Sequence, residues 1–351
     1  MLHKIQEAFE AGLADMREGQ GAALAIRQRG VLLCQNCSDS WQPNTLVPVF
    51  SATKAAASAC LLLALWEKNL TPQTPVGEIW SKFPQPKATV AQLLSHQCGL
   101  AAWAHSAPID DLEACRQAVE DSAPLWVPPQ HGYHPQTFGP IIDILMLRLC
   151  GMRISDYWEK NIRAPRKLDF YIGHVPEEAY SRIAPLHAPR IPAGGLPKDE
   201  FFRQYYTPGT LVYRAFHSVS GLESVREMNT PAAWQSGSPA KGGVASAGGL
   251  AQFYQVLMDC CPEVCRWMSV PLVSGRDKVL QRETAFSCGA MCAPTELFAE
   301  LPGAFGHAGA GGSHAFCCPS LGLSFAYVTN RMEPGVLPGE RVRRILRELK
   351  F

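Results

Sequence analysis

A serine and a lysine three residues apart stand directly before the longest apolar run of the chain. Ser51-Ala52-Thr53-Lys54 leads into a stretch that ends at Trp66. Residues three apart share a helix face, so a helix starting here places the Ser51 hydroxyl and the Lys54 amine within one turn. A serine hydroxyl becomes nucleophilic when a base takes its proton, and a buried lysine can be that base. With the N–H groups of the helix start, nucleophile, base and half an oxyanion hole fit into one turn.

The same Ser-x-x-Lys spacing occurs a second time in the chain. Ser238-Pro239-Ala240-Lys241 lies between Gly237 and Gly242 and contains a proline, so we interpret it as a loop. A chain of this length is expected to contain about one such match by chance. Only Ser51 opens a long apolar helix, and we therefore assign the chemistry to the first copy.

Tyr133 is the best candidate for a second proton-handling group. It lies in a turn, Gly132-Tyr133-His134-Pro135, just before a predicted helix over residues 137–150. A phenolate, or a phenol hydrogen-bonded to Lys54, could relay the proton from Ser51 to a leaving group. The alternative is a tyrosine that fills a gap in the core.

A glycine-rich segment supplies the third piece of a possible site. It reads Gly306-His307-Ala308-Gly309-Ala310-Gly311-Gly312-Ser313 and leads into a predicted strand. Glycines let a backbone approach a ligand closely, and an N–H group here, opposite that of Ser51, would complete an oxyanion hole. His307 could donate to a substrate carbonyl or carboxylate. The alternative is a flexible hairpin turn.

The elements that must position these residues come from both ends of the chain. β-prone runs that flank short turns predict one hairpin near each end, over residues 22–34 and 314–329. Amphipathic helices lie at both termini, and the sequence between the hairpins is rich in helix patterns, at residues 90–95, 112–120, 137–150 and 154–161. This pattern predicts an α+β fold, an antiparallel sheet flanked by helices plus an all-helical domain.

The same pattern predicts the domain boundaries. Residues 1–69 and 222–351 are expected to form the sheet domain, and residues 70–221 the helical insertion domain. Residues 187–206 show little periodicity and are predicted to form a long loop over the site.

Composition and charge argue against several classes of partner. Of the 351 residues, 47% are hydrophobic and 18% charged, enough for a sizeable core. The net charge is +1, which gives no electrostatic footprint for nucleic acid or an anionic membrane. The N-terminus lacks the apolar core of a signal peptide, and the longest apolar run is too short to span a bilayer. We therefore expect a cytoplasmic protein without nucleic-acid or membrane partners.

The cysteines do not point to a metal site. Thirteen cysteines, an odd number, predict reduced thiols rather than a disulfide framework. Cys34-Gln35-Asn36-Cys37 has the spacing of half a zinc site, but the sequence has no second half-site at a suitable spacing. We expect neither a metal nor a cofactor.

Three segments, in order, match the motifs of one superfamily. Ser51-x-x-Lys54, the motif at Tyr133 and His307-Ala308-Gly309 resemble the three motifs of the penicillin-recognising serine hydrolases. That superfamily includes class C β-lactamases, DD-peptidases and family VIII carboxylesterases. The resemblance spans nearly the whole chain and is closest to the esterase branch, over residues 49–54, 93–100, 133–139, 243–251, 305–313 and 325–332.

The resemblance implies the serine β-lactamase/DD-peptidase fold, with the site between the sheet and the helical domain. It implies that Ser51 is acylated and that Lys54 and Tyr133 share the proton transfers. The oxyanion hole is implied to consist of the backbone N–H groups of Ser51 and Ala310. The predicted substrate-binding residues are His134, His307 and Gly309.

Two positions depart from the β-lactamase pattern. Pro135 stands where an asparagine is usual, and His307 stands where a lysine usually binds the substrate carboxylate. Both changes weaken recognition of a β-lactam, and both are tolerated in the esterase branch. The resemblance therefore implies a carboxylesterase-type serine hydrolase that cleaves small-molecule carboxylic esters through an acyl-enzyme on Ser51.

Three alternatives stay open at this point. An acyltransferase would use the same acyl-enzyme with an alcohol as acceptor, and weak β-lactamase activity could accompany either reaction. A structural or assembly protein with a vestigial site is the third, and the intact Ser51, Lys54 and Tyr133 argue against it. The sequence carries no signal for a particular oligomeric state.

Overall fold

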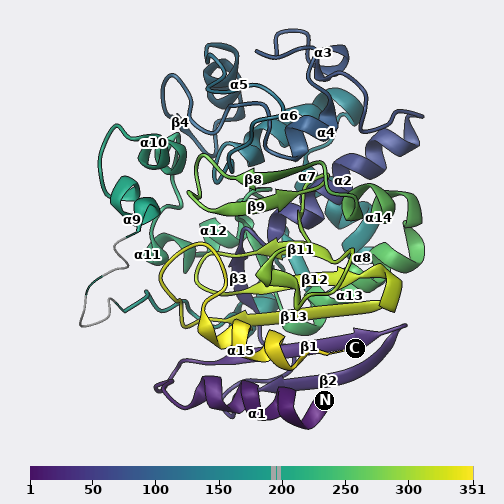
Figure 1. Cartoon of the computed structure of the whole chain (residues 1–351), viewed down its shortest axis with the longest axis vertical. Coiled ribbons are helices and arrows are strands. Elements are labelled where there is room, and N and C mark those ends of the chain that lie inside the picture. The colour runs from purple at the N-terminus through teal and green to yellow at the C-terminus, as the bar shows by residue number, and fades with distance from the viewer. Residues whose placement is uncertain (191–194, 196–198, 351) are drawn as a thin grey trace.

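An eight-stranded antiparallel sheet runs through the molecule, and its strands come from both ends of the chain (Figure 1). The computed structural model describes residues 1–190, 195 and 199–350. The strand order is β2-β1-β13-β12-β11-β10-β9-β8. Ala22 pairs with Thr329, so the two hairpins predicted from the sequence lie side by side in one sheet. The strands are β1 (Ala22–Gln28), β2 (Val31–Cys37), β8 (Val273–Arg276), β9 (Glu283–Phe286), β10 (Met291–Cys292), β11 (Phe305–Ala308), β12 (His314–Cys318) and β13 (Leu323–Thr329).

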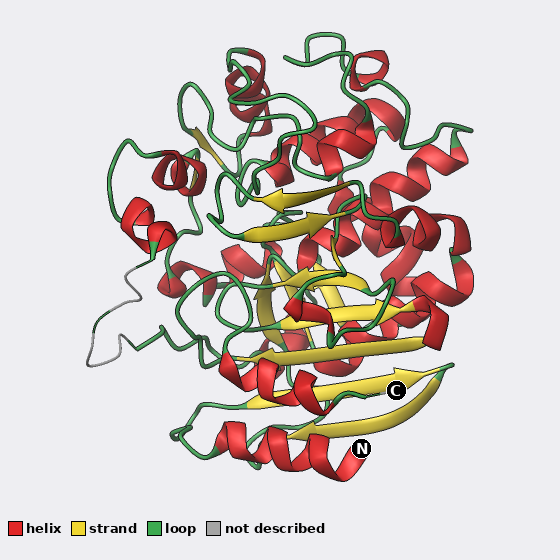
Figure 2. Ribbon diagram, in the orientation of Figure 1, coloured by secondary structure: helices red, strands yellow, loops and turns green. Residues whose placement is uncertain are grey.

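Helices cover both faces of this sheet because both faces are apolar. Leu24 and Ile26 of β1 pack in one hydrophobic cluster with α1 (Leu2–Leu13) and α15 (Glu340–Glu348). Ala23 and Ala25 point the other way, into a cluster that contains α2 (Thr53–Glu67) and α13 (Ala247–Cys260). Successive residues of a strand face opposite sides, so this alternation produces a helix–sheet–helix arrangement (Figure 2). The α+β fold class predicted from the sequence is confirmed.

Between residues 70 and 221 most of the regular elements are helices, joined by long connections. The predicted helices are present, α5 (Leu112–Glu120) with the predicted bounds and α6 starting one residue later, at Phe138. The further helices described are α3 (Val76–Ile79), α4 (Val90–Leu94), α6 (Phe138–Cys150), α7 (Ile154–Trp158), η1 (Glu159–Arg163), α8 (Ala164–Arg166), η2 (Glu177–Arg182), α9 (Glu200–Tyr205), α10 (Leu211–His217), α11 (Val225–Met228), α12 (Pro231–Gln235), α14 (Pro262–Ser269), η3 (Glu296–Phe298) and η4 (Pro319–Leu321).

The same segment also contributes short strands, which differs from the all-helical expectation. They are β4 (Ala107–Pro108), β5 (Phe170–Ile172) and β6 (Val219–Ser220). β5 pairs with β7 (Gly243–Ala245), which pairs in turn with β3 (Val47–Phe50). Strands of two or three residues are too short to leave a periodic pattern in the sequence. The domain boundaries stay a prediction.

Part of the loop predicted over residues 187–206 is a helix. Residues 191–194 and 196–198 lie outside the described residues. Helix α9 starts at Glu200, within this segment. Asp199 is its N-cap: the carboxylate accepts the N–H of Phe202 at 3.0 Å, a group that has no acceptor within the first turn of the helix. Over the described ranges, we find no helix with both the length and the apolar character that crossing a membrane requires.

Candidate active site

Ser51 lies in a tight turn between β3 and α2. The helix begins at Thr53 rather than at Ser51 itself. Phe50 has a φ of +47°, a strained conformation for a bulky residue, and it aims the next residue away from the strand. The Thr53 hydroxyl holds this turn, since it donates to the Phe50 carbonyl at 2.6 Å and accepts the Gly243 N–H at 2.9 Å. Ser51 is left partly exposed on a fixed backbone.

Lys54 is fully buried, and its amine contacts three oxygen atoms. Its Nζ lies 2.9 Å from the Pro135 carbonyl, 2.9 Å from the Ala240 carbonyl and 3.2 Å from the Ser51 hydroxyl. Burial holds the pKa of Lys54 well below its usual range, and the charge of Lys241 acts in the same direction. A neutral amine that gives its two hydrogens to the carbonyls turns its lone pair toward the Ser51 hydroxyl.

The second Ser-x-x-Lys segment contacts Lys54 through its backbone. It forms a turn, as its glycines and proline predicted. Its Ala240 carbonyl is one of the two that orient the Lys54 amine. Lys241 is also buried, donates to the Gly221 carbonyl at 3.1 Å, and has its pKa lowered by burial to about 8.

Tyr133 lies beside Ser51 and Lys54 and is surrounded by aromatic rings. It is 2% exposed, with its ring centroid 5.0 Å from the Lys54 amine. The His96, His307 and Phe286 rings lie 5.0, 5.8 and 6.2 Å from it. Burial raises the pKa of Tyr133, opposed by a hydrogen bond with Ser51. The residue is therefore a phenol at neutral pH. Of the two forms considered from the sequence, a phenolate and a protonated phenol, this favours the phenol.

The sequence predicts an oxyanion hole made of two backbone N–H groups, those of Ser51 and Ala310. A side chain on Gly309 would place its Cβ 2.2 Å from the Val49 carbonyl, so only glycine lets the β11–β12 connection approach the end of β3 this closely. Ala310 follows and is partly exposed. In the described part of the chain, the N–H groups of Ser51 and Ala310 have no hydrogen-bond acceptor. This leaves both available to a developing oxyanion.

His307 reaches the site as a neutral ring. It is 1% exposed, and burial is the main cause that lowers its pKa to about 3. Its Nδ1 lies 2.7 Å from the Ala308 carbonyl and therefore carries the hydrogen, which leaves Nε2 as an acceptor. Nε2 has no partner among the residues that the structure describes. His307 thus offers an acceptor, rather than the donor or positive charge that would hold a substrate carboxylate.

His134 has no ring nitrogen left for a substrate. Its Nδ1 donates to the Gly132 carbonyl at 2.8 Å, and its Nε2 accepts the Leu100 N–H at 3.0 Å. The side chain is 1% exposed. The structure therefore places His134 behind Tyr133, where it ties the turn of that residue to the helical part of the chain.

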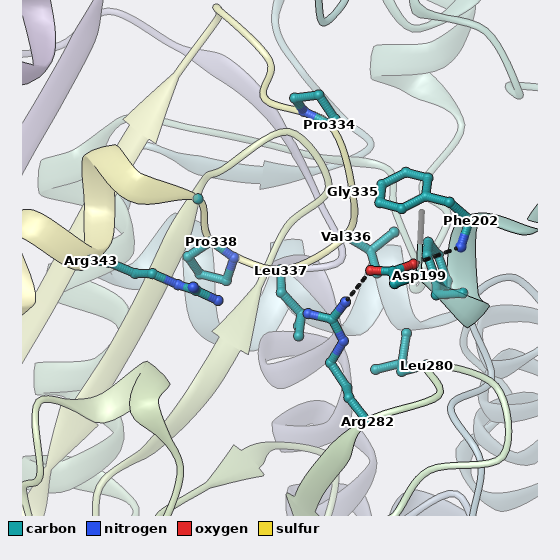
Figure 3. A pocket seen from close by; sticks show the side chains of 12 residues that line it. Asp199, Phe202, Leu280, Arg282, Pro334, Gly335, Val336, Leu337, Pro338 and Arg343 are labelled. Carbon is teal, nitrogen blue, oxygen red and sulfur yellow. Dashed lines mark hydrogen bonds and ion pairs between the residues drawn. The ribbon is translucent and has the colours of Figure 1, made fainter. Parts of the chain in front are cut away.

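A pocket of about 240 Å³ lies between residues 334–339 and the start of helix α9 (Figure 3). The N–H of Gly311 donates to the carbonyl of Gly335, which lines this pocket. Arg282 and Arg343 point toward Leu337 in its wall, and Arg282 pairs with Asp199 at 3.6 Å. Much of the remaining lining is apolar: Phe201, Phe202, Leu280, Pro334, Val336 and Pro338.

The chain is similar to known proteins in sequence and in fold. The chain is 26% identical over 320 residues to "Esterase/beta-lactamase LipL" of Mycobacterium tuberculosis, covering 83% of this chain and 71% of that protein. A penicillin-binding protein homolog from Caulobacter crescentus matches at 27% identity and a TM-score of 0.84, covering 98% of this chain and 95% of that one. A family VIII carboxylesterase shares the fold, with a TM-score of 0.83, 23% identity and the same coverage.

The family model named Beta-lactamase matches residues 6–350, nearly the whole chain. This match agrees with the fold and with the resemblance found in the three motifs. The chain therefore belongs to the Beta-lactamase family.

Proposed function

We propose that the chain is a serine hydrolase that cleaves carboxylic esters of small molecules through an acyl-enzyme on Ser51. The environment of the Lys54 amine carries the proposal. Two carbonyl acceptors take two of its hydrogens, and burial favours its neutral form, in which the remaining lone pair faces the Ser51 hydroxyl at 3.2 Å. A neutral lysine in hydrogen-bond contact with a serine is the requirement for base-assisted nucleophilic attack.

In the proposed acylation, the Ser51 proton passes to the Lys54 amine as Oγ bonds to the ester carbonyl carbon. The carbonyl oxygen becomes an oxyanion and accepts the N–H groups of Ser51 and Ala310. When the tetrahedral intermediate collapses, the C–O bond to the alcohol breaks. The leaving oxygen takes the proton that Lys54 returns through the Tyr133 phenol, which is protonated because burial raises its pKa.

In the proposed deacylation, water replaces the alcohol. Its proton passes to Lys54 as its oxygen bonds to the acyl carbon, and the carboxylic acid leaves as Ser51 regains a proton. An alcohol in place of this water would give acyl transfer.

The neutral His307 supports an ester substrate over a β-lactam. A β-lactam antibiotic carries a carboxylate, and neither an uncharged acceptor at His307 nor Pro135 supplies a donor for its carboxylate or amide. The name of the LipL relative, an esterase/beta-lactamase, agrees with an ester-cleaving function and leaves room for slow β-lactam turnover.

The test uses p-nitrophenyl butyrate and a fluorophosphonate probe. We expect a burst followed by steady turnover, covalent labelling at Ser51 by mass spectrometry, and loss of both in Ser51→Ala. Ser238→Ala is the matched control, because Ser238 also precedes a buried lysine by three residues, and it should keep both activities. Full activity in Ser51→Ala would overturn the proposal. An unlabelled wild-type protein would instead favour a non-catalytic assembly role.

Product analysis distinguishes hydrolysis from acyl transfer. In the presence of competing alcohols, a hydrolase yields the free acid, whereas an acyltransferase yields mainly the new ester. We expect the acid to dominate.

A further inference from the structure

A buried carboxylate lies directly behind the turn that carries Tyr133. Asp277, in the connection between β8 and β9, is 0% exposed. It accepts the Tyr133 N–H at 3.1 and 3.0 Å from its two oxygens, and the N–H groups of Val279 and Leu280 at 2.7 Å each. The Thr284 hydroxyl donates to the carboxylate at 3.4 Å. Two of these N–H groups are local, but that of Tyr133 comes from 144 residues away.

No cation offsets this carboxylate within the described ranges. Asp277 forms no salt bridge there. The nearby His131 lies 2.9 Å from the Thr284 hydroxyl, and burial lowers the pKa of this histidine, so it stays uncharged at neutral pH. The N–H groups are therefore the main support of a group that is costly to bury.

The hairpin that carries Asp277 also supports the ring of Tyr133. Phe286 of β9 lies nearly parallel to this ring, at an interplanar angle of 6°. The β8–β9 hairpin thus holds Tyr133 at two points, its backbone through Asp277 and its ring through Phe286. With both fixed, the direction of the phenol is fixed as well.

We propose that Asp277 is a positioning residue that sets the place of the Tyr133 phenol against Ser51 through the Tyr133 backbone. The inference rests on the proposed function, in which that phenol passes a proton to the leaving group. A misplacement of about 1 Å in such a group costs roughly 100-fold in rate. In Asp277→Asn an amide nitrogen, which cannot accept, replaces one of the two oxygens that share the Tyr133 N–H, so this contact loses one of its two acceptors while the side chain keeps its shape.

Asp143→Asn is the matched control for this substitution. Asp143 is also a buried carboxylate, 1% exposed, and it accepts the Ile154 N–H at 2.7 Å and the Arg153 side chain at 2.8 Å. Neither of these two hydrogen bonds involves Tyr133. Both variants are expected to lose stability, so all rates are measured below the onset of unfolding of each protein.

The expected result is a catalytic loss in one variant only. For Asp277→Asn, kcat and kcat/KM with p-nitrophenyl butyrate should fall together by about 10- to 100-fold, because the lost contribution belongs to the transition state. Asp143→Asn should stay within about threefold of wild type. Equal losses in the two variants would overturn the proposal.

A double substitution tests whether Asp277 acts through Tyr133. In a Tyr133→Phe background the phenol is already gone, so adding Asp277→Asn should change the residual rate of Ser51 labelling by less than about twofold. The same 10- to 100-fold loss in that background would sink the proposal. If Ser51→Ala is inactive while these comparisons fail, only the inference on Asp277 falls. An active Ser51→Ala removes the proposed function itself.

Discussion

Replacing Gly309 with alanine puts one methyl group against the backbone of β3. The new Cβ would lie 2.2 Å from the Val49 carbonyl oxygen. Close carbon–oxygen contacts normally lie at about 3.3 Å, so the two segments must separate by about 1 Å. Because the N–H group of Ala310 moves with this segment, the substitution displaces one of the two proposed oxyanion donors. We expect kcat/KM to fall by about 100- to 1,000-fold, or about 2.7–4 kcal/mol of transition-state stabilisation.

The assay is steady-state hydrolysis of p-nitrophenyl butyrate, together with urea denaturation to establish that the variant is folded. Gly248→Ala is the matched control, because its Cβ would meet the Gln35 side chain at an ordinary 3.6 Å within helix α13. This variant should keep wild-type kcat/KM. A folded Gly309→Ala protein with activity within threefold of wild type would refute the close-approach argument.

Three further expectations follow from contacts around the site. Thr53→Val removes the hydrogen-bond partner of two backbone groups, the part-buried Phe50 carbonyl and the buried Gly243 N–H. It should lower the free energy of unfolding by about 2–4 kcal/mol, against about 1 kcal/mol for Thr53→Ser, as measured by urea denaturation. Lys241→Met removes a positive charge near Lys54 and so raises the pKa of Lys54. Because less neutral amine then remains at a given pH, the acid limb of the kcat/KM profile should move to higher pH. Lys241→Arg keeps the charge and should leave this limb in place. Because the pKa of His307 is lowered to about 3, this residue should stay neutral between about pH 5 and pH 8. We therefore compare kcat/KM for an ester that carries a distal carboxylate with kcat/KM for its neutral analogue, and the ratio of the two should stay constant over this range. A rise in the ratio toward acid pH would contradict a neutral His307.

The parts of the fold and site that the sequence predicts are those with local signals. The spacing of Ser51 and Lys54, and the turns at Gly30 and Gly322, depend on neighbouring residues, and the structure places all of them as expected. The two hairpins could therefore be assigned to one sheet before any contact was known. Glycines at the Ala310 segment predicted a close backbone approach for the same reason.

The partners of these residues could not be predicted, because they depend on contacts across the chain. Ala240 orients the Lys54 amine from 186 residues away, and it does so with a carbonyl that every residue type carries. No sequence pattern can identify such an acceptor. Asp277 is a single acidic residue in a turn, which is ordinary in any sequence, and only the fold brings it to Tyr133. The protonation states of His307 and His134 likewise follow from burial, which the sequence does not specify residue by residue.

The pairing of Ala22 with Thr329 joins two strands that are synthesised at very different times. A ribosome adds roughly 5–20 residues per second, so about 15–60 s pass between synthesis of β1 and synthesis of β13. During that interval the edge of β1 that later joins β13 is open to other strands. In the proposed mechanism Ser51 and Lys54 are synthesised early but need Ala310, so a first turnover would report that almost the whole chain has been synthesised and folded.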